Sequence, residues 1–361
     1  TKISWCDSTI NFYEGCTKVS DGCKNCYAEA RDRRFHGKPK TIGLAAEIEP
    51  PHWGPGAPRR KSKSAVKDAL RLNKLPWICD RCGGSFASRD LHGGKDGYNC
   101  KGGLNATEEM HRRRIFSLSL GDWLDPEVPV EWLAEMLGTI RKCDQMTWIL
   151  CSKRPELFQS RMFATWPVAD TDTANWINRW AASGTPPPNI IILTSVENQA
   201  MADKRIPELR RIPAACRGLS LEPLLGPVKV SSWLSKPLGD FIEVPKTEGQ
   251  LHQFPHPVSA RAEGVDWLIV GGESGPKARS CNVDWVRSLV AQGQSAGVAT
   301  FVKQFGSNCV TDNEAVNDWP EGTEIEGMQP AGRVLLRDKK GGDHAEWPAD
   351  LRVREWPGGL K

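Results

Sequence analysis

Three cysteines stand close together near the start of the chain. Cys16, Cys23 and Cys26 are spaced C-x6-C-x2-C, and Tyr27 directly follows the last of them. Thiolates from one short loop can converge on a soft metal centre, because cysteine sulfur ligates both zinc and the irons of iron–sulfur clusters. Structural zinc sites take four protein ligands. Three cysteines with no fourth nearby therefore suggest a cluster with one open iron. Zinc completed by a distant His or Cys and unrelated buried thiols remain alternatives.

The loop resembles the cluster loop of radical S-adenosylmethionine (SAM) enzymes, although its first gap is three residues longer than their usual C-x3-C-x2-C. Most of the chain more closely resembles the phage- and mobile-element-associated three-Cys-motif proteins, a radical-SAM-like family. The matching pieces are GCTKVSDGCKNCYAEA, SVENQAMADKRIPEL, LSLEPLLGPV and IVGGESGPKAR, which extend to about Gly306. This resemblance implies a [4Fe–4S] cluster on Cys16, Cys23 and Cys26, SAM on the open iron with Tyr27 beside it, and a partial barrel.

A second group of cysteines lies between residues 77 and 103. Cys79 and Cys82 form a C-x2-C knuckle, Cys100 lies farther on, and His92 is the most plausible fourth ligand. This glycine-rich segment has too few apolar residues for a core, so a bound Zn²⁺ would be needed to fold it. We expect a small zinc ribbon. A second iron–sulfur cluster and a pair of reduced surface thiols are the alternatives.

Short apolar runs that end in polar residues recur along the chain and alternate with helical periodicity. Helices are predicted over 130–142, 282–296 and from Tyr27 onward. The predicted strands are 9–13, 114–120, 148–151, 189–194, 218–221, 266–270 and 300–303. Strand–helix alternation with continuously apolar strands is typical of a parallel α/β fold, either a barrel or a doubly wound sheet. The cysteine loop after the first strand favours a barrel.

The expected fold class is therefore α/β, a radical-SAM-like partial (β/α) TIM-type barrel with a small zinc-ribbon-like insertion. We divide the chain into four segments: a first strand, cluster loop and helix; a basic, Cys-containing metal-binding insertion; the remaining barrel units, interrupted at about 231–263; and a C-terminal extension. Their bounds are 1–57, 58–113, 114–310 and 311–361.

Polar side chains at the strand ends fit the needs of SAM, whose amino and sulfonium groups attract acceptors and whose carboxylate attracts a cation. Parallel strands place all their carboxyl ends on one side of a barrel, so these residues are predicted to line one cavity. Lys153 and Arg154 are the cations, and Gly271 and Gly272 permit close backbone approach. The acceptors are Asp122, Ser195, Glu197, Glu222 and Glu273. Helix caps or surface charges are the alternative roles.

The distribution of basic residues indicates which partner the protein binds. The net charge is only +4, but basic residues cluster at 31–34, 59–67, 111–114 and 204–211. The second and third clusters flank the expected zinc ribbon, which predicts DNA or RNA binding through Arg59 to Lys67 and Arg112 to Arg114. Balance by nearby acids is the alternative.

The sequence shows no signal peptide and no membrane-length apolar run, and its twelve cysteines point to metal rather than disulfides, so we expect a cytoplasmic location and no membrane contact. The cysteines outside the two motifs are expected to be mostly buried: Cys6, Cys143, Cys151, Cys216, Cys281 and Cys309.

Together these features predict a radical SAM enzyme that modifies or repairs nucleic acid or a nucleotide. A protein partner encoded nearby is also considered. One alternative is a non-catalytic, metal-dependent nucleic-acid-binding protein. The other is a TIM-barrel glycoside hydrolase that uses strand-end glutamates, which would leave the three-cysteine loop unexplained.

Overall fold

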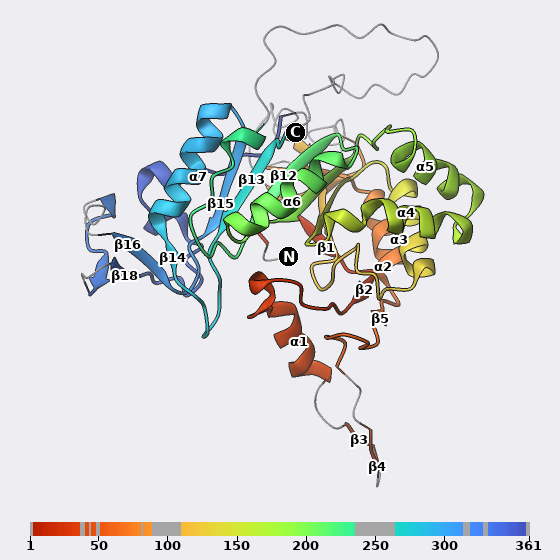
Figure 1. Cartoon of the computed structure of the whole chain (residues 1–361), viewed down its shortest axis with the longest axis horizontal. Coiled ribbons are helices and arrows are strands. Elements are labelled where there is room, and N and C mark those ends of the chain that lie inside the picture. Colours follow the sequence, from red (N-terminus) through yellow and green to blue (C-terminus); the bar gives the residue numbers. More distant parts are fainter. Residues whose placement is uncertain are drawn as a thin grey trace, which may run out of the picture. The chain divides into compact units, whose positions relative to one another are not determined.

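The computed structural model describes residues 3–36, 40–42, 45–47, 51–80, 82–88, 110–234, 264–312, 318–327 and 331–358 of the 361-residue chain (Figure 1). His92, Cys100 and most of the expected insertion at 231–263 lie outside these ranges. The chain groups into two compact units. One holds Thr1–Ile192 with Ile212–Ala214 and Leu360–Lys361, and the other Leu193–Arg211 with Ala215–Gly359.

Within the described ranges, seven parallel strands form a curled sheet of the half-barrel type. Its strand order is β1 (Ser8–Ile10), β9 (Arg114–Ser117), β10 (Thr147–Ser152), β11 (Ile190–Ser195), β12 (Cys216–Leu221), β13 (Trp267–Gly271) and β15 (Ala299–Gln304). Five of the seven predicted strands are found with their ends shifted by one or two residues, because continuously apolar runs are those that a sheet covered by helices buries. The mixed α/β class is confirmed.

The first and second predicted strands are partly wrong. Residues 9–13 divide between β1, which pairs with β9, and β2 (Tyr13–Glu14), which pairs with β5 (Arg60–Lys61). The Asn11 amide group diverts the chain between them, since its oxygen accepts the Leu120 backbone N–H at 2.9 Å. Strand β9 ends at Ser117 instead of residue 120, because Leu118 has a φ of 63°, in the left-handed region that a strand cannot continue through.

The helices of the first unit are α1 (Tyr27–His36), α2 (Ala65–Asn73), α3 (Val130–Lys142), α4 (Phe158–Thr165) and α5 (Thr171–Ala181). Helices α3, α4 and α5 pack on one another (Figure 1). Trp123 and Trp180 stack with ring centroids 6.4 Å apart, and Phe158 meets Trp180 edge-on at 5.4 Å. The predicted helix over 130–142 is confirmed to the residue. No described helix has the length and apolar character that crossing a membrane requires.

Small sheets complete the first unit. In one, β6 (Trp77–Cys79) lies between β7 (Ser85–Phe86) and β8 (Met110–Arg112), and in another β3 (Lys40–Ile42) pairs with β4 (Ala45–Glu47). The described parts of the chain also contain the 3-10 helices η1 (Asp21–Cys23), η3 (Pro155–Leu157), η4 (Trp166–Val168), η5 (Ser231–Trp233), η7 (His344–Glu346) and η8 (Ala349–Leu351).

The second unit contains α6 (Gln199–Arg211) and α7 (Val283–Ala296), the latter close to its predicted bounds and closed by Gly297 in the left-handed conformation. A further sheet has the order β14 (Cys281–Asn282), β16 (Cys309–Asp312), β18 (Ala331–Leu335) and β17 (Glu324–Glu326).

The end of the chain covers edge strand β15. The backbone N–H of Val302 donates to the Val353 carbonyl, and the N–H of Glu355 donates to the Thr300 carbonyl, each at 2.9 Å. Unpaired edges invite association with other strands, and this cover removes that exposure.

Gly272 lies where two parts of the second unit meet. Its N–H donates to the Gln304 carbonyl at 2.9 Å, and a Cβ added at this position would collide with the backbone carbonyl of Phe305. Close approach at Gly272 therefore serves contact with the end of β15, which differs from the expectation that this glycine makes room for a ligand.

We predict that Gly272→Ala destabilises the protein by roughly 1–3 kcal/mol, because the new methyl group must push a backbone segment aside. Gly226→Ala is the matched control, since a Cβ at Gly226 meets nothing within 4 Å. Urea denaturation of both variants measures the difference. Equal midpoints for Gly272→Ala and Gly226→Ala would contradict the assigned role.

Candidate metal centre

The cysteine loop begins at Gly15, directly after β2. Gly15 has a φ of 111°, and a Cβ there would collide with the His52 carbonyl oxygen. Only glycine permits this close approach between the loop and the segment at residues 52–54. The Gly54 backbone N–H then donates to the Cys16 carbonyl at 3.0 Å. These backbone contacts thus fix the position of Cys16 independently of the contacts of its thiol.

The Cys16 thiol lies beside the end of strand β10. Nη1 of Arg154 donates to Cys16 Sγ at 3.5 Å, and Nη2 of the same guanidinium donates to the Thr17 carbonyl at 2.7 Å. Burial raises the pKa of Cys16 to about 12, and the nearby Asp122 carboxylate adds to the rise, while Arg154 opposes it. In the absence of a metal the thiol is therefore protonated at neutral pH, and a metal that binds it must displace that proton.

Cys26 lies at the start of α1, and Cys23 at the end of η1. Burial raises the pKa of Cys26, whereas backbone N–H groups of Glu29 and Ala28 and the charge of Lys153 lower it. Ser20 Oγ lies 4.0 Å from Cys23 Sγ. Burial outweighs these effects, so the Cys26 thiol, like that of Cys16, must lose a proton when a metal binds. Two of the three cysteines thus lie near the cations that follow β10.

Asp122 organises this strand end. Its carboxylate accepts the Ser152 hydroxyl at 2.7 Å, the Lys153 backbone N–H at 2.9 Å and Arg154 Nη1 at 2.9 Å. The side chain is buried. Asp122 therefore orients the Arg154 guanidinium and holds the backbone at Lys153. It would act on a ligand through Arg154 rather than as an exposed acceptor.

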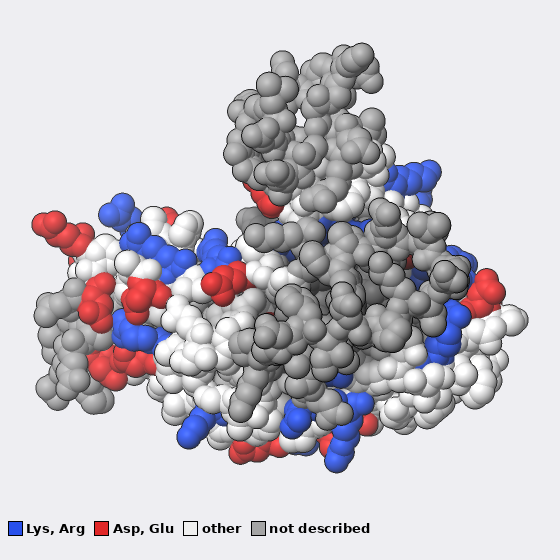
Figure 2. Space-filling view, turned by 90° about the horizontal axis from the view of Figure 1, so that it is seen from above, with Lys and Arg blue, Asp and Glu red and all other residues white. Residues whose placement is uncertain are grey.

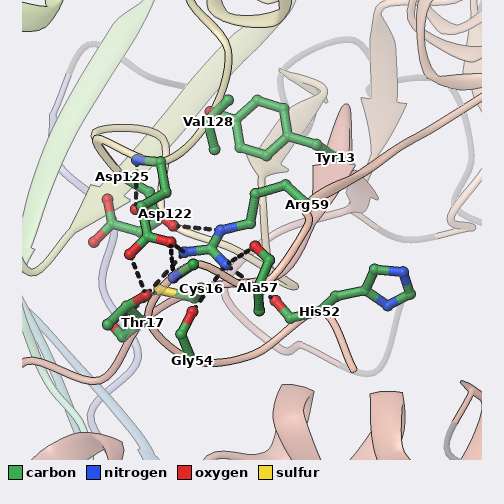
Figure 3. A network of polar contacts seen from close by, with 12 residues as sticks. Tyr13, Cys16, Thr17, His52, Gly54, Ala57, Arg59, Asp122, Asp125 and Val128 are labelled. Atoms are coloured by element: carbon green, nitrogen blue, oxygen red, sulfur yellow. Dashed lines mark hydrogen bonds and ion pairs between the residues drawn. The ribbon is translucent and has the colours of Figure 1, made fainter. Parts of the chain in front are cut away.

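Arg59 binds the segments around the cysteine loop together (Figure 3). Its side chain is fully buried, and Nε donates to Asp125 Oδ2 at 2.9 Å. Nη2 donates to Thr17 Oγ1, also at 2.9 Å. Nη1 donates to three backbone carbonyls, those of His52, Gly54 and Ala57. A single guanidinium thus saturates acceptors from the loop at 52–57, the cysteine loop and the turn after β9.

Several basic residues predicted to contact nucleic acid are not on the surface. Arg59 is buried in the network just described, and Arg113 is also buried. Arg114 is buried in an ion pair with Asp7, whose pKa is held well below its usual range by His111 and Arg114 despite burial. The predicted contacts of these three arginines with nucleic acid were therefore wrong, whereas Lys61, Lys63 and Lys67 are exposed and binding through them stays a prediction. On the face in Figure 2, basic and acidic residues are interspersed among the described residues.

In the second unit, each predicted carboxylate already has a cation. Glu197 is fully buried, and Arg205 donates to it at 2.8 Å and to the Ser195 carbonyl at 2.9 Å. Arg205 was expected in a basic surface cluster, which was wrong because of this burial. The other two ion pairs join Glu222 to Lys303 at 2.5 Å and Glu273 to Arg279 at 2.7 Å.

A cofactor amine at Glu197 would have to displace Arg205.

The ion pairs of Glu197, Glu222 and Glu273 provide no support for a glycosidase arrangement, which needs one carboxyl group as an acid and another as a base or nucleophile. A single cavity lined by the strand ends of both units stays a prediction.

Cys79 and Cys82 flank a tight turn between β6 and β7. The Gly83 N–H donates to the Cys79 carbonyl at 2.9 Å, and the Gly84 N–H donates to Cys82 Sγ at 3.4 Å. Cys79 is buried and Cys82 is exposed. An amide directed at a cysteine sulfur in a C-x2-C turn suits a metal knuckle, but the other two predicted ligands, His92 and Cys100, lie outside the described residues.

Across the described ranges, no three His, Cys, Asp or Glu side chains are arranged as a group that could hold a metal ion. The metal sites at Cys16, Cys23 and Cys26 and at Cys79 and Cys82 thus stay predictions that rest on donor chemistry. Five of the six remaining cysteines are buried as expected, and Cys151 is half-buried.

Sequence reasoning missed the roles of Arg59, Asp125 and Gly15. The glycine directly before Cys16 was the available signal for Gly15. No local pattern connects Arg59 with Asp125, which lies 66 residues farther on.

Residues 1–332 match the model of DUF5131, described as a protein of unknown function. The chain therefore belongs to the DUF5131 family. Comparison with curated proteins and with solved structures gave no match.

We predict that Arg59→Ala destabilises the protein by roughly 3–5 kcal/mol, because it leaves the Asp125 carboxylate buried without its cation. Lys61→Ala is the control: the Lys61–Glu135 pair is exposed, so its loss should cost less than about 0.5 kcal/mol. Chemical denaturation measures both.

A double variant, Arg59→Ala with Asp125→Ala, should recover part of the loss because no fully buried carboxylate is left without its cation. Glu127 also loses its contact with Arg59, but its side chain is 30% exposed and stays in contact with water. An Arg59→Ala effect as small as that of Lys61→Ala would contradict the assigned role of the pair.

Proposed function

We propose that this DUF5131 protein is a radical SAM enzyme of the three-Cys-motif type, acting on nucleic acid or a nucleotide by modification or lesion repair. Cys16, Cys23 and Cys26 would hold a [4Fe–4S] cluster with one iron open to SAM. A separate Zn²⁺ would bind Cys79, Cys82, His92 and Cys100. The proposal also includes a cytoplasmic location and a protein partner encoded nearby. It is consistent with the absence of disulfides among the eleven described cysteines.

The observation that carries the proposal is the pairing of partly exposed thiols with cations at the end of one parallel strand. Arg154 contacts Cys16, and the charge of Lys153 acts on Cys26. Iron–sulfur clusters are ligated by cysteine thiolates, and nearby positive charge favours the loss of the thiol protons that ligation requires. A strand end next to a ligand-binding loop is also where α/β barrels carry their chemistry.

The groups of this chain would bind and orient the cofactors. When bound, the cluster and SAM supply an electron and a 5′-deoxyadenosyl radical that can abstract hydrogen. Lys153 and Arg154 offer cations for the SAM carboxylate. Asp122 accepts from Arg154 Nη1 and from the Lys153 backbone N–H, so it orients the guanidinium directly and the lysine only through its backbone. The exposed Tyr27 follows the last cysteine, and its hydroxyl donates to the Ser119 carbonyl, which holds the ring beside the loop.

Anaerobic reconstitution with iron and sulfide tests the proposal. We expect a brown protein with about four irons per chain and visible absorption. Reduction in the presence of SAM should yield 5′-deoxyadenosine. Cys16→Ser, Cys23→Ser and Cys26→Ser should each lose most of the iron and the product, while Cys82→Ser, in the other motif, should keep both. A colourless protein, or iron retained in all three variants, would refute the proposal.

The zinc site is tested on the protein as purified, without reconstitution. Metal analysis should find about one Zn²⁺ per chain, since a ribbon of this kind takes four protein ligands. A Cys79→Ser, Cys82→Ser variant should lose this zinc because two of the four ligands are gone. Cys143→Ser, which changes a buried thiol outside both motifs, should retain it. Zinc content unchanged by the double substitution would show that the site does not exist.

A further inference from the structure

One face of α1 carries a stripe of aromatic and basic side chains. The stripe consists of Tyr27, Arg31, Arg34 and Phe35, at positions i, i+4, i+7 and i+8, which share one side of a helix. Tyr27 is 58% exposed and Phe35 57% exposed. Large rings are rarely left this open, and here two of them lie on the same short helix.

Charge on α1 is divided between its two sides. Both acids of the helix are buried: Asp32 bonds His52 at 2.7 Å, and Glu29 pairs with Lys18 and Arg33, each at 2.7 Å. The basic residues of α1 and the preceding loop are exposed: Lys18, Lys24, Arg31, Arg33 and Arg34. The loop contributes one exposed acid, Asp21. Arg31 also pairs with the half-buried Glu14 at 3.5 Å. The exposed side chains of α1 and the preceding loop are thus mostly basic, even though the net charge of the whole chain is small.

Cations and rings on the stripe are arranged together. The guanidinium of Arg31 lies 5.4 Å from the Phe35 ring centroid, and that of Arg34 lies 5.7 Å from it. These cation–π contacts hold both guanidinium groups against an exposed ring. The ring can stack on a base while the guanidinium groups meet phosphates, which is how proteins bind single strands without sequence readout.

We propose that the α1 stripe binds single-stranded nucleic acid and lays it alongside the cysteine loop. Charge complementarity favours a polyanion, and the exposed rings favour one with unstacked bases over a duplex. Tyr27 directly follows Cys26, and with a rise of about 1.5 Å per residue the stripe extends roughly 12 Å from there to Phe35. This inference names the partner of the proposed enzyme and rests on that proposal for its link to catalysis.

Fluorescence anisotropy with a mixed-sequence, labelled single-stranded DNA or RNA, titrated with the full chain, tests the inference. If three arginines contact phosphates, raising salt from about 50 to 200 mM should weaken binding about 20-fold, because a single strand releases about 0.7 counterion per contact. Phe35→Ala should weaken binding about 10-fold through lost stacking. Arg34→Gln should reduce the slope of log affinity against log salt by about 0.7.

Trp166→Ala and Arg179→Gln are the matched controls, an exposed ring and an exposed arginine elsewhere in the first unit. Both should bind the strand as the parent does, and circular dichroism should show all variants folded. The inference is overturned if no strand binds, if the α1 variants behave like the controls, if a duplex binds as tightly as the single strand, or if poly-glutamate competes as well as the oligonucleotide.

The same variants separate this inference from the proposed function. Phe35→Ala and Arg34→Gln should take up iron as the parent does. A protein that binds single strands but takes up no iron contradicts the proposed function alone. A protein that takes up iron and forms 5′-deoxyadenosine but binds no strand contradicts the α1 inference alone.

Discussion

The buried ion pair between Arg59 and Asp125 is the constraint on which the arrangement around the cysteine loop depends. Neither side chain is exposed, and a charge buried without a partner costs several kcal/mol. The remaining guanidinium N–H groups are directed at acceptors in the cysteine loop and at residues 52–57 (Figure 3). The loop cannot move far without leaving buried donors unsatisfied, so Cys16 is held in place by an interaction in which it takes no part.

A second constraint acts through Asp122 and Arg154. Asp122 receives three hydrogen bonds from the end of β10, and Arg154 extends from there to Cys16 and Thr17. Thr17 therefore contacts both arginines, Arg59 through its hydroxyl and Arg154 through its carbonyl. Two separate ion pairs converge on one short piece of loop. Such rigidity would preorganise thiols for a metal, and it places the strand-end cations where an anionic ligand could meet them.

The sequence predicted the framework well because its signals were local. Apolar runs predicted five of the seven sheet strands to within two residues. Helical periodicity predicted both ends of α3 to the residue and those of α7 to within one residue. Asp122 and Arg154 were expected at strand ends and do contact each other. The prediction that Arg59 is exposed was wrong, although Lys61, Lys63 and Lys67 of the same cluster are exposed. An arginine in a polar segment has the same local pattern whether it is solvated or buried. Arg59 is buried against Asp125, and Arg114 against Asp7. Both partners are distant in sequence, so no local pattern predicts the burial. The ion pairs of the strand-end glutamates with Arg205, Lys303 and Arg279 were not predicted for a similar reason, because a glutamate after a strand has the same local pattern whether or not a cation pairs with it.

We propose that Cys16, Cys23 and Cys26 hold a cluster with one iron that the protein does not ligate. Electron paramagnetic resonance of the reduced, reconstituted protein before and after addition of SAM tests it most directly. An open iron that chelates SAM predicts a changed spectrum, with a new coupling when the SAM amino group carries nitrogen-15. A spectrum unaffected by SAM would show that a fourth protein ligand closes the cluster, and the absence of any iron signal would contradict the cluster itself.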